Sequence, residues 1–241
     1  MKRILLVLLC GIFSFGLTAC IANSGNNNKA AQKIVTEDML EFKAQYEELN
    51  GQTNAAGRTY ATLDLPEYNL IKFVTPQEIL AIRNSGRGLI FFAFPTCPWC
   101  RQASPILVDL ALEMKLDAIN YIDMLEVRSL WEVQDGNAVK TRDGAPGYYE
   151  LLESFSSILP DAFPHLHPFV VKDDDGNEYE TGEQRIFVPL VVAIRDGEIV
   201  GYHGYTVPFN EGQTQWDALT DQQVADLSSI YRKLIEEVQL R

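Results

Sequence analysis

A Cys-Pro-Trp-Cys segment at residues 97–100 closely follows an apolar run at residues 89–94. The run combines aromatic and aliphatic side chains without charge or polar alternation, which is typical of a strand buried on both faces. Residues 101–114 favour a helix apart from Pro105. The two cysteines are therefore expected at the turn from a buried strand into the first turn of a helix.

This placement has a chemical consequence for Cys97. The first N–H groups of a helix lack partners within the helix, and the helix dipole is positive at that end, so a thiolate is stabilised there. The pKa of a cysteine in such a motif can fall from about 8.5 to about 3.5–7.5. Pro98 suits the first helical position, where its missing N–H costs nothing. We therefore predict Cys97 as the attacking nucleophile and Cys100, one turn into the helix, as a more buried and less acidic resolving thiol.

Zinc and an inert disulfide are the alternatives for this pair. A zinc site needs about four ligands, and the chain's other cysteines, Cys10 and Cys20, lie in an N-terminal segment that the fold cannot use. His165 and His167 are only two residues apart, closer than the usual zinc-ligand spacing. A disulfide across so short a loop would restrict the unfolded chain little. Neither a metal nor another cofactor is expected, and the redox-active pair itself carries the chemistry.

The N-terminus has the pattern of a targeting segment. Lys2 and Arg3 precede an apolar stretch at residues 4–17 that is too short for a comfortable membrane span. The stretch ends in Leu-Thr-Ala-Cys, which resembles the bacterial lipobox, where the cysteine, here Cys20, is lipidated and becomes the new N-terminus. We expect a signal peptide at residues 1–19 and a flexible tether at residues 20–35. A plain secretory signal with an accidental cysteine is the alternative.

The charge of the chain bears on its partners. The formal net charge is −13, and removing residues 1–19 takes away Lys2 and Arg3 and no acid, which leaves −15. So acidic a protein is a poor candidate for binding nucleic acid or an anionic membrane surface. We expect the membrane connection to be the lipid on Cys20 alone, at the extracytoplasmic face of the cell membrane. Export also favours exchange between thiols and disulfides, because the site then lies outside the reducing cytosol.

The remaining elements are predicted from periodicity and capping residues. Helices are expected at residues 36–49, 75–85, 125–131, 148–159 and 220–240. Strands are expected near residues 70–74, 118–124, 185–194 and 199–205, with a hairpin at 169–180. The Asp-rich run in that hairpin lacks the glycine and glutamate positions of a calcium loop, so it is interpreted as a solvated turn. A strand–helix–strand order at the cysteines predicts a parallel pair.

Two motifs in order along the chain resemble the thioredoxin-like superfamily. The first is the Cys-Pro-Trp-Cys segment, with Pro105 five residues after the second cysteine. The second is residues 185–189, followed by an apolar strand and the Asp196-Gly197 turn. The resemblance covers residues 72–124 and 183–241. It implies an α/β fold in which a central mixed sheet is flanked by helices, with one domain at residues 36–241. The N-terminal helix would be an extension and residues 125–182 an insertion between the second strand and the cis-proline strand.

The resemblance also implies site geometry. The Val188–Pro189 peptide would be cis and would hold the Val188 backbone beside the cysteines, where an extended substrate strand can pair with it. Trp99 and Pro98 would flank the same substrate groove. One departure is Phe91, which stands where thioredoxins carry a buried acid, so water or another group must handle the proton of Cys100. The Pro-Trp dipeptide is nearer to glutaredoxins, which leaves the direction of electron flow open.

The expected function is a lipid-anchored, extracytoplasmic thiol–disulfide oxidoreductase acting on protein or peptide substrates with a redox partner protein. The chain looks like lipoprotein members of the thioredoxin-like group from Gram-positive bacteria, some of which resemble bacteriocin transport accessory proteins. The alternative is therefore a non-catalytic accessory or binding protein that uses the same fold. A third possibility is a metal-delivery protein using the two cysteines and His203.

Overall fold

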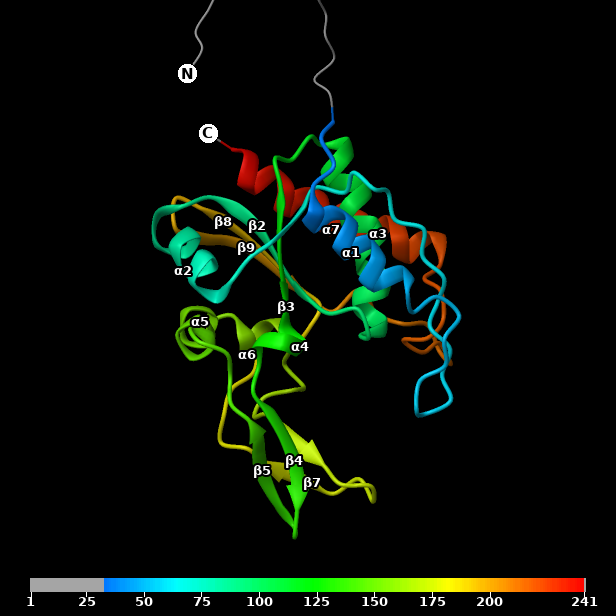
Figure 1. Cartoon of the computed structure of the whole chain (residues 1–241), viewed down its shortest axis with the longest axis vertical. Helices are drawn as coiled ribbons and strands as arrows, with labels where there is room; N and C mark the ends of the chain where they lie inside the picture. The colour runs from blue at the N-terminus through cyan, green and yellow to red at the C-terminus, as the bar shows by residue number, and fades with distance from the viewer. Residues whose placement is uncertain (1–32, 241) are drawn as a thin grey trace, which may run out of the picture. The chain divides into compact units, whose positions relative to one another are not determined.

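The computed structural model describes residues 33–240, so the predicted signal peptide, the lipidation site Cys20 and most of the predicted tether lie outside the described residues. Its centre is a five-stranded sheet in the order β1-β3-β2-β8-β9 (Figure 1). The strands are β1 (Ile71–Phe73), β2 (Gly88–Ala93), β3 (Ile119–Asp123), β8 (Leu190–Arg195) and β9 (Glu198–Gly204). β1, β3 and β2 run parallel, whereas β8 and β9 are antiparallel to their neighbours. The chain is thus mixed α/β with a central mixed sheet, as the sequence predicts.

β2 lies in the middle of the sheet, between β3 and β8. All six of its residues are buried, which explains its unbroken apolar sequence. Phe91 is in register with Tyr121 on one side and with Val191 on the other. The sheet therefore holds the end of β2 rigidly, and this is the point from which the cysteine segment leaves.

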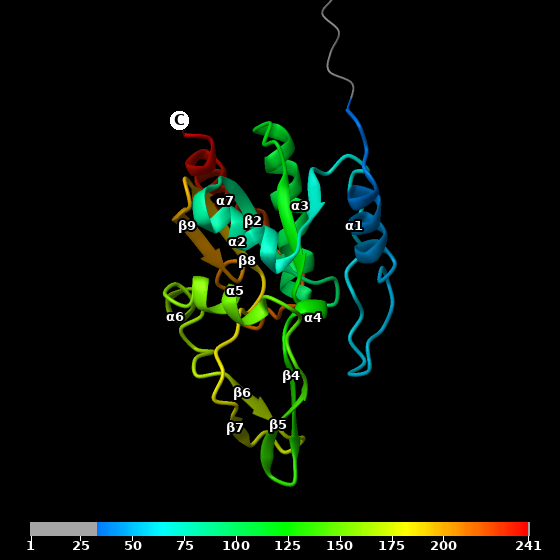
Figure 2. The ribbon, with the colours of Figure 1, turned by 60° about the vertical axis from the view of Figure 1, so that its left-hand side comes forward.

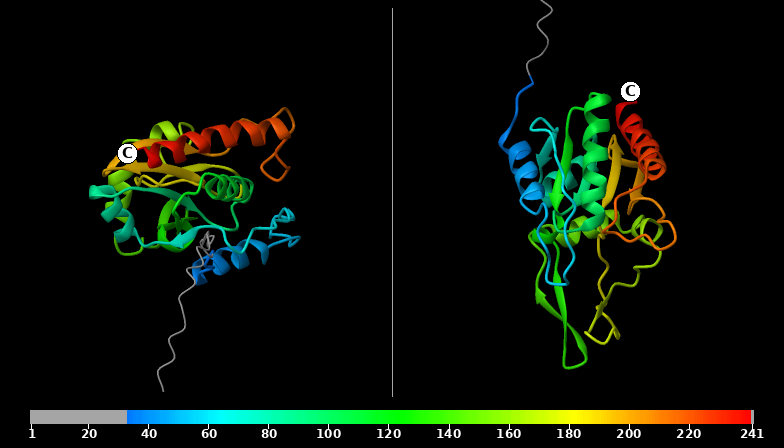
Figure 3. Two further views of the ribbon diagram at one scale, coloured as in Figure 1. Left: turned by 90° about the horizontal axis from the view of Figure 1, so that it is seen from above. Right: turned by 90° about the vertical axis from the view of Figure 1, so that its right-hand side faces the viewer.

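Helices cover both faces of the sheet (Figures 2 and 3). α3 (Pro98–Glu113) packs against α7 (Asp221–Gln239), and α2 (Pro76–Ser85) packs against α5 (Tyr148–Phe155). In β9, Gly201 faces Leu234 of α7, while Gly204 faces Ala162 of α6 (Leu159–Ala162). Residues three apart in a strand point to opposite faces, so α7 and α6 lie on opposite sides. α1 (Glu37–Glu47) lies beside β1.

The predicted helix starts are confirmed. Thr36 caps α1 and accepts a hydrogen bond from the backbone N–H of Met39. Thr75 and Glu78 form a complete capping box at the start of α2, and Thr220 begins α7 in the same way. Each cap pairs N–H groups that the first helical turn would otherwise leave unpaired. These caps fix the helix boundaries to within a residue or two of the prediction.

The insertion differs from its prediction in two places. The helix predicted at residues 148–159 ends at Phe155, and the separate short helix α6 follows it. The helix predicted at residues 125–131 is wrong beyond α4 (Met124–Val127), because residues from Leu130 onward form a hairpin of β4 (Leu130–Gln134) and β5 (Asn137–Arg142). Asp135 and Gly136 both adopt positive φ, 51° and 71°, which makes the tight turn that joins the strands. The strands on either side of this turn are not among the predicted elements.

The second hairpin of the insertion is confirmed. It comprises β6 (Val170–Lys172) and β7 (Glu178–Glu180). Asp173 closes its turn by accepting hydrogen bonds from the backbone N–H groups of Asp175 and Asn177. Figures 1 and 2 show both hairpins extending together beyond the end of the central sheet. Among residues 33–240, no helix is both long enough and apolar enough to cross a membrane.

Candidate active site

The cysteine pair lies where β2 passes into α3. Cys97 is the N-cap residue of α3, and Pro98 occupies its first helical position, as predicted. The Cys97 sulfur accepts a hydrogen bond from the backbone N–H of Cys100 at 3.3 Å. Both thiols are free; Cys97 keeps 5% of its surface exposed and Cys100 none. An incoming reagent can therefore approach Cys97 but not Cys100.

The two thiols have opposite pKa shifts. Burial by itself raises the pKa of Cys97, but hydrogen bonds from Cys100 and from the Trp99 N–H, together with the charge of Arg128, outweigh it and lower the pKa. The pKa of Cys100 is raised well above its usual value, first by burial and then by its hydrogen bond to Cys97 and the charge of Cys97. The arrangement therefore favours a single thiolate, and this thiolate is on Cys97, the more accessible of the two sulfurs.

Val188 and Pro189 lie opposite the pair. The Val188–Pro189 peptide is cis, as the resemblance implied. The Val188 carbonyl oxygen lies 3.9 Å from the Cys97 sulfur, and the backbone N–H of Tyr205 donates to the Pro189 carbonyl at 3.0 Å. Among the described residues, no backbone carbonyl accepts a hydrogen bond from the Val188 N–H. The His167–Pro168 peptide is also cis, which was not predicted.

Trp99 and Pro98, predicted to flank one groove, line two separate hollows. Trp99 borders a hollow of about 630 Å³ with His165, His203 and Tyr205. Pro98 borders an apolar pocket of about 230 Å³ whose walls include Tyr60 and Trp216. The Trp99 hollow is lined in part by Tyr205, in the loop after β9, whose N–H donates to Pro189. The Pro98 pocket is lined by residues of α3 and of the segment after α1.

Three buried phenol groups interact electrostatically with Cys100. Tyr46, Tyr121 and Tyr231 are fully buried; the Tyr46 hydroxyl interacts with Ser104 and Tyr121, whereas the Tyr231 hydroxyl has no hydrogen-bond partner within the described part of the chain. Burial raises the pKa of all three, and electrostatic interaction with Cys100 raises it further. All three phenols are therefore neutral at neutral pH. Sequence reasoning placed Phe91 in the position of the usual acid but did not find these tyrosines.

Asp123 is the ionisable carboxyl that acts on Cys100. It ends β3, and its side chain accepts a hydrogen bond from the Leu125 N–H at 2.8 Å. Burial raises the pKa of Asp123, although backbone hydrogen bonds from Leu125 and Glu126 oppose the shift. The negative charge of Asp123 raises the pKa of Cys100 further. Asp123, 23 residues after Cys100, is therefore a candidate for the group that handles the proton of Cys100.

Arg128 is the cation that acts on the Cys97 thiol, and no sequence motif marks it. Its guanidinium lies 4.7 Å from the ring centroid of Phe94, which precedes the cysteine segment. Its positive charge lowers the pKa of Cys97. The residue belongs to the insertion, just after α4, and reaches the site only because α4 packs on β2 and β3.

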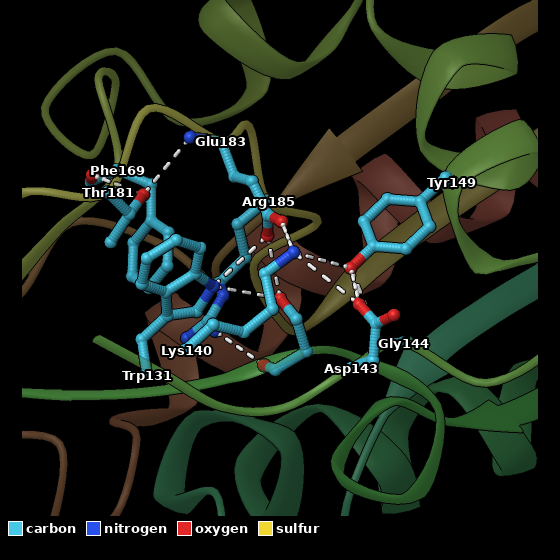
Figure 4. Close-up of polar contacts among 10 residues, drawn as sticks. Trp131, Lys140, Asp143, Gly144, Tyr149, Phe169, Thr181, Glu183 and Arg185 are labelled. Atoms are coloured by element: carbon cyan, nitrogen blue, oxygen red, sulfur yellow. Dashed lines mark hydrogen bonds and ion pairs between the residues drawn. The ribbon is translucent and has the colours of Figure 1, made fainter. Parts of the chain in front are cut away.

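A polar cluster joins the two hairpins of the insertion (Figure 4). Lys140 of β5 forms an ion pair with Glu183, which follows β7 and also accepts hydrogen bonds from Ser129 and Trp131. Arg185 lies 3.7 Å from the ring centroid of Phe169 and donates to the Ser129 carbonyl at 2.7 Å. These contacts fix the segment that carries Arg128 and the segment that leads to Pro189 against each other.

The histidines do not assemble with the cysteines. Across residues 33–240, no three or more histidine, cysteine, aspartate or glutamate side chains gather in a way that could hold a metal ion. The His203 ring is hydrogen-bonded to the Thr206 carbonyl at 2.5 Å and packs against Tyr231.

Comparison with known proteins gives no family assignment. The chain matches no family model, and a search of curated proteins finds no match.

Proposed function

We propose that the protein is a thioredoxin-like thiol–disulfide oxidoreductase in which Cys97 attacks and Cys100 resolves. The observation that carries the proposal is the asymmetry of two thiols on one helical turn, with opposite pKa shifts. The strand order of the sheet and a cis proline opposite the pair support a thioredoxin-like fold. The finer family, a lipoprotein of the thioredoxin-like group, rests on the sequence motifs alone.

The reaction follows from the two thiols. The Cys97 thiolate attacks one sulfur of a substrate disulfide, forming a mixed disulfide while the other substrate sulfur leaves as a thiolate and takes up a proton. Cys100 then loses its proton and attacks the Cys97 sulfur, which releases the second substrate thiolate and leaves a Cys97–Cys100 disulfide. Two electrons pass from the pair to the substrate. A redox partner protein returns them, and the reverse sequence oxidises a substrate dithiol.

Backbone geometry supports a protein or peptide substrate. An extended segment can pair with the Val188 backbone next to Cys97, because its N–H has no backbone partner among the described residues. The hollow beside Trp99 can receive a side chain of that segment. The proposed substrate is therefore an extended stretch of chain around a cysteine rather than a small thiol alone.

The lipobox-like sequence supports a position at the outer face of the cell membrane. Cys20 would carry the lipid, and residues 21–35 would separate the domain from the bilayer. Replacing Cys20 by Ser should abolish incorporation of a radiolabelled fatty acid and release the protein from the membrane fraction. Unchanged labelling would contradict anchoring at this residue.

The oxidoreductase is tested by trapping its intermediate. With Cys100→Ser, a disulfide-bonded peptide should accumulate as a mixed disulfide on Cys97, because the second step is blocked. Cys97→Ser is the matched control and should trap nothing. If neither variant nor the wild type reacts, the oxidoreductase is excluded. If the double variant Cys97→Ser, Cys100→Ser still performs the protein's function in the cell, a non-catalytic accessory protein is favoured instead.

A further inference from the structure

The cation beside Cys97 has unused hydrogen-bonding capacity. The half-buried guanidinium of Arg128 stacks on Phe94, yet its side chain donates no hydrogen bond to any residue from 33 to 240 and forms no ion pair with them. Its Nε is buried without a partner. A guanidinium has five N–H donors in a planar fork that fits a carboxylate. The Cys97 thiolate and Asp123 act on this cation electrostatically without taking up its N–H donors, so the guanidinium can still bind an anion that comes from outside.

A second arginine and a tyrosine share the same environment. Arg185 is 9% exposed, and Tyr148 is fully buried with a hydroxyl that lacks a hydrogen-bond partner in the described chain. The charge of Arg128 helps to lower the pKa of Arg185 to about 10, after the larger effect of burial. Arg185 also donates to the carbonyl of Ser129, the residue next to Arg128. The region next to Cys97 therefore concentrates positive charge in an otherwise acidic protein.

The nearby acids act on this charge electrostatically, but none of those in the described chain forms an ion pair with Arg128. Glu183 is held by Lys140, Ser129 and Trp131. Asp123 accepts the N–H of Leu125 and does not come within ion-pair distance of either arginine. Glu126 is exposed. What is missing in the described residues is an acidic group at the Arg128 guanidinium.

We propose that Arg128, assisted by Arg185, binds a carboxylate that the substrate carries close to its reacting sulfur. The proposal rests on the oxidoreductase function and narrows its substrates to disulfides flanked by acidic groups, either in a protein segment or in a small acidic thiol. Binding there would hold the substrate sulfur near Cys97, because Arg128 packs on the Phe94 ring, Phe94 accepts a hydrogen bond from the Cys97 N–H, and the charge of Arg128 acts on the Cys97 thiol. A charge-assisted, bidentate contact of this kind also discriminates against cationic substrates.

The test compares exchange rates for three small symmetrical disulfides. Dithiodipropionate carries two carboxylates, hydroxyethyl disulfide is neutral and cystamine carries two amines. The reduced full-length protein should react faster with dithiodipropionate than with cystamine after each rate is divided by that of free cysteine with the same disulfide. In Arg128→Gln, this preference should fall roughly 3- to 10-fold, as expected for one partly solvated charged hydrogen bond. Because a change in Cys97 reactivity affects all three rates alike, the ratio isolates recognition.

Two variants distinguish a direct contact between Arg128 and the substrate carboxylate from a general electrostatic attraction by positive charge. Arg128→Lys keeps the charge and the stacking on Phe94 but loses the planar fork, so the preference should fall partway while the fold is kept. Arg58→Gln removes an exposed arginine elsewhere on the surface and should leave the ratio unchanged. An unchanged ratio in both Arg128 variants, or an equal loss in Arg58→Gln, overturns the proposal.

A binding measurement without redox chemistry distinguishes this proposal from the oxidoreductase itself. The double variant Cys97→Ser, Cys100→Ser should bind a fluorescent peptide with serine in place of its cysteine more tightly when glutamates flank the serine than when lysines do. Adding Arg128→Gln should remove the difference. Weak binding of the acidic peptide combined with fast reaction of dithiodipropionate would assign the site to small acidic thiols. Equal binding of both peptides with no preference among the small disulfides overturns the proposal even if exchange occurs.

Discussion

At the scale of single residues, the reactivity of Cys97 depends on the hydrogen bond from Cys100. Replacing Cys100 by Ala removes its thiol donor and leaves the backbone N–H of residue 100 in place, so the pKa of Cys97 should rise and its alkylation near neutral pH should slow about tenfold. Cys100→Ser keeps a donor and should stay close to the wild-type rate. The difference should shrink as pH rises, because above both pKa values Cys97 is fully ionised in every variant. Alkylation followed by peptide mass spectrometry measures this; equal rates in the two variants contradict it.

Asp123 provides a second residue-scale prediction. Its negative charge raises the pKa of Cys100, a lesser effect than burial, so Asp123→Asn should lower that pKa. Asparagine can still accept the Leu125 N–H that caps α4, so the fold should persist. The measurement is the pH dependence of the Cys100 Cβ chemical shift, which follows ionisation of the thiol without a reagent, in a Cys97→Ser background with and without the substitution. An unchanged midpoint would mean that Asp123 is too well solvated to act on the thiol.

At the scale of elements, the two hairpins of the insertion depend on Glu183. Its side chain is 17% exposed, and its ion pair with Lys140 is reinforced by Ser129 and Trp131. Glu183→Gln should lower the free energy of unfolding by about 1–2 kcal/mol in urea titrations, because hydrogen bonds to a partly buried charge are lost. The control is Glu178→Gln, whose pair with Lys172 is 56–60% exposed and should contribute less than about 0.5 kcal/mol.

The same pair has a pH dependence with a definite sign. Burial raises the pKa of Glu183, but hydrogen bonds from Lys140, Ser129 and Trp131 outweigh it, so the folded-state pKa lies below the unfolded one. Its contribution is fully present above the unfolded value, about 4.3, and is lost as pH falls through the folded value. The stability difference between wild type and Glu183→Gln should therefore disappear in acid. A difference that persists at low pH would point to packing instead of charge.

Elements with local signals were predictable, and those without were not. The buried run of β2, the caps at Thr36, Thr75 and Thr220 and the turn at Asp196 each depend on residues close in sequence. The β4–β5 hairpin was missed because Leu130 and Trp131 suit a helix or a strand equally, and cross-strand pairing decides between them.

At the scale of the whole molecule, what the sequence could not provide was the convergence of distant segments. The cysteine motif indicated Cys97 and Cys100, and the second motif, at residues 185–189, indicated Val188 and Pro189 through the resemblance. Arg128 and Tyr46 carry no such pattern; they come near the pair only through the packing of α4 and α1. The residues of this site that belong to a motif can be predicted from the sequence, and those such as Arg128 and Tyr46 that belong to no motif cannot.

The net charge of −13 gives a prediction for the molecule as a whole. Its long-range field attracts cations and repels anions, and raising ionic strength from about 0.01 to 0.5 M shortens the Debye length from about 30 Å to well under 10 Å. Exchange with cystamine should therefore slow about two- to fivefold over this range. In Arg128→Gln, which lacks the local cation, exchange with dithiodipropionate should accelerate by a similar factor, since only the repulsive field remains. If salt leaves both rates unchanged, short-range groups alone control access to Cys97; if it slows both, local positive charge other than Arg128 dominates the approach of anions.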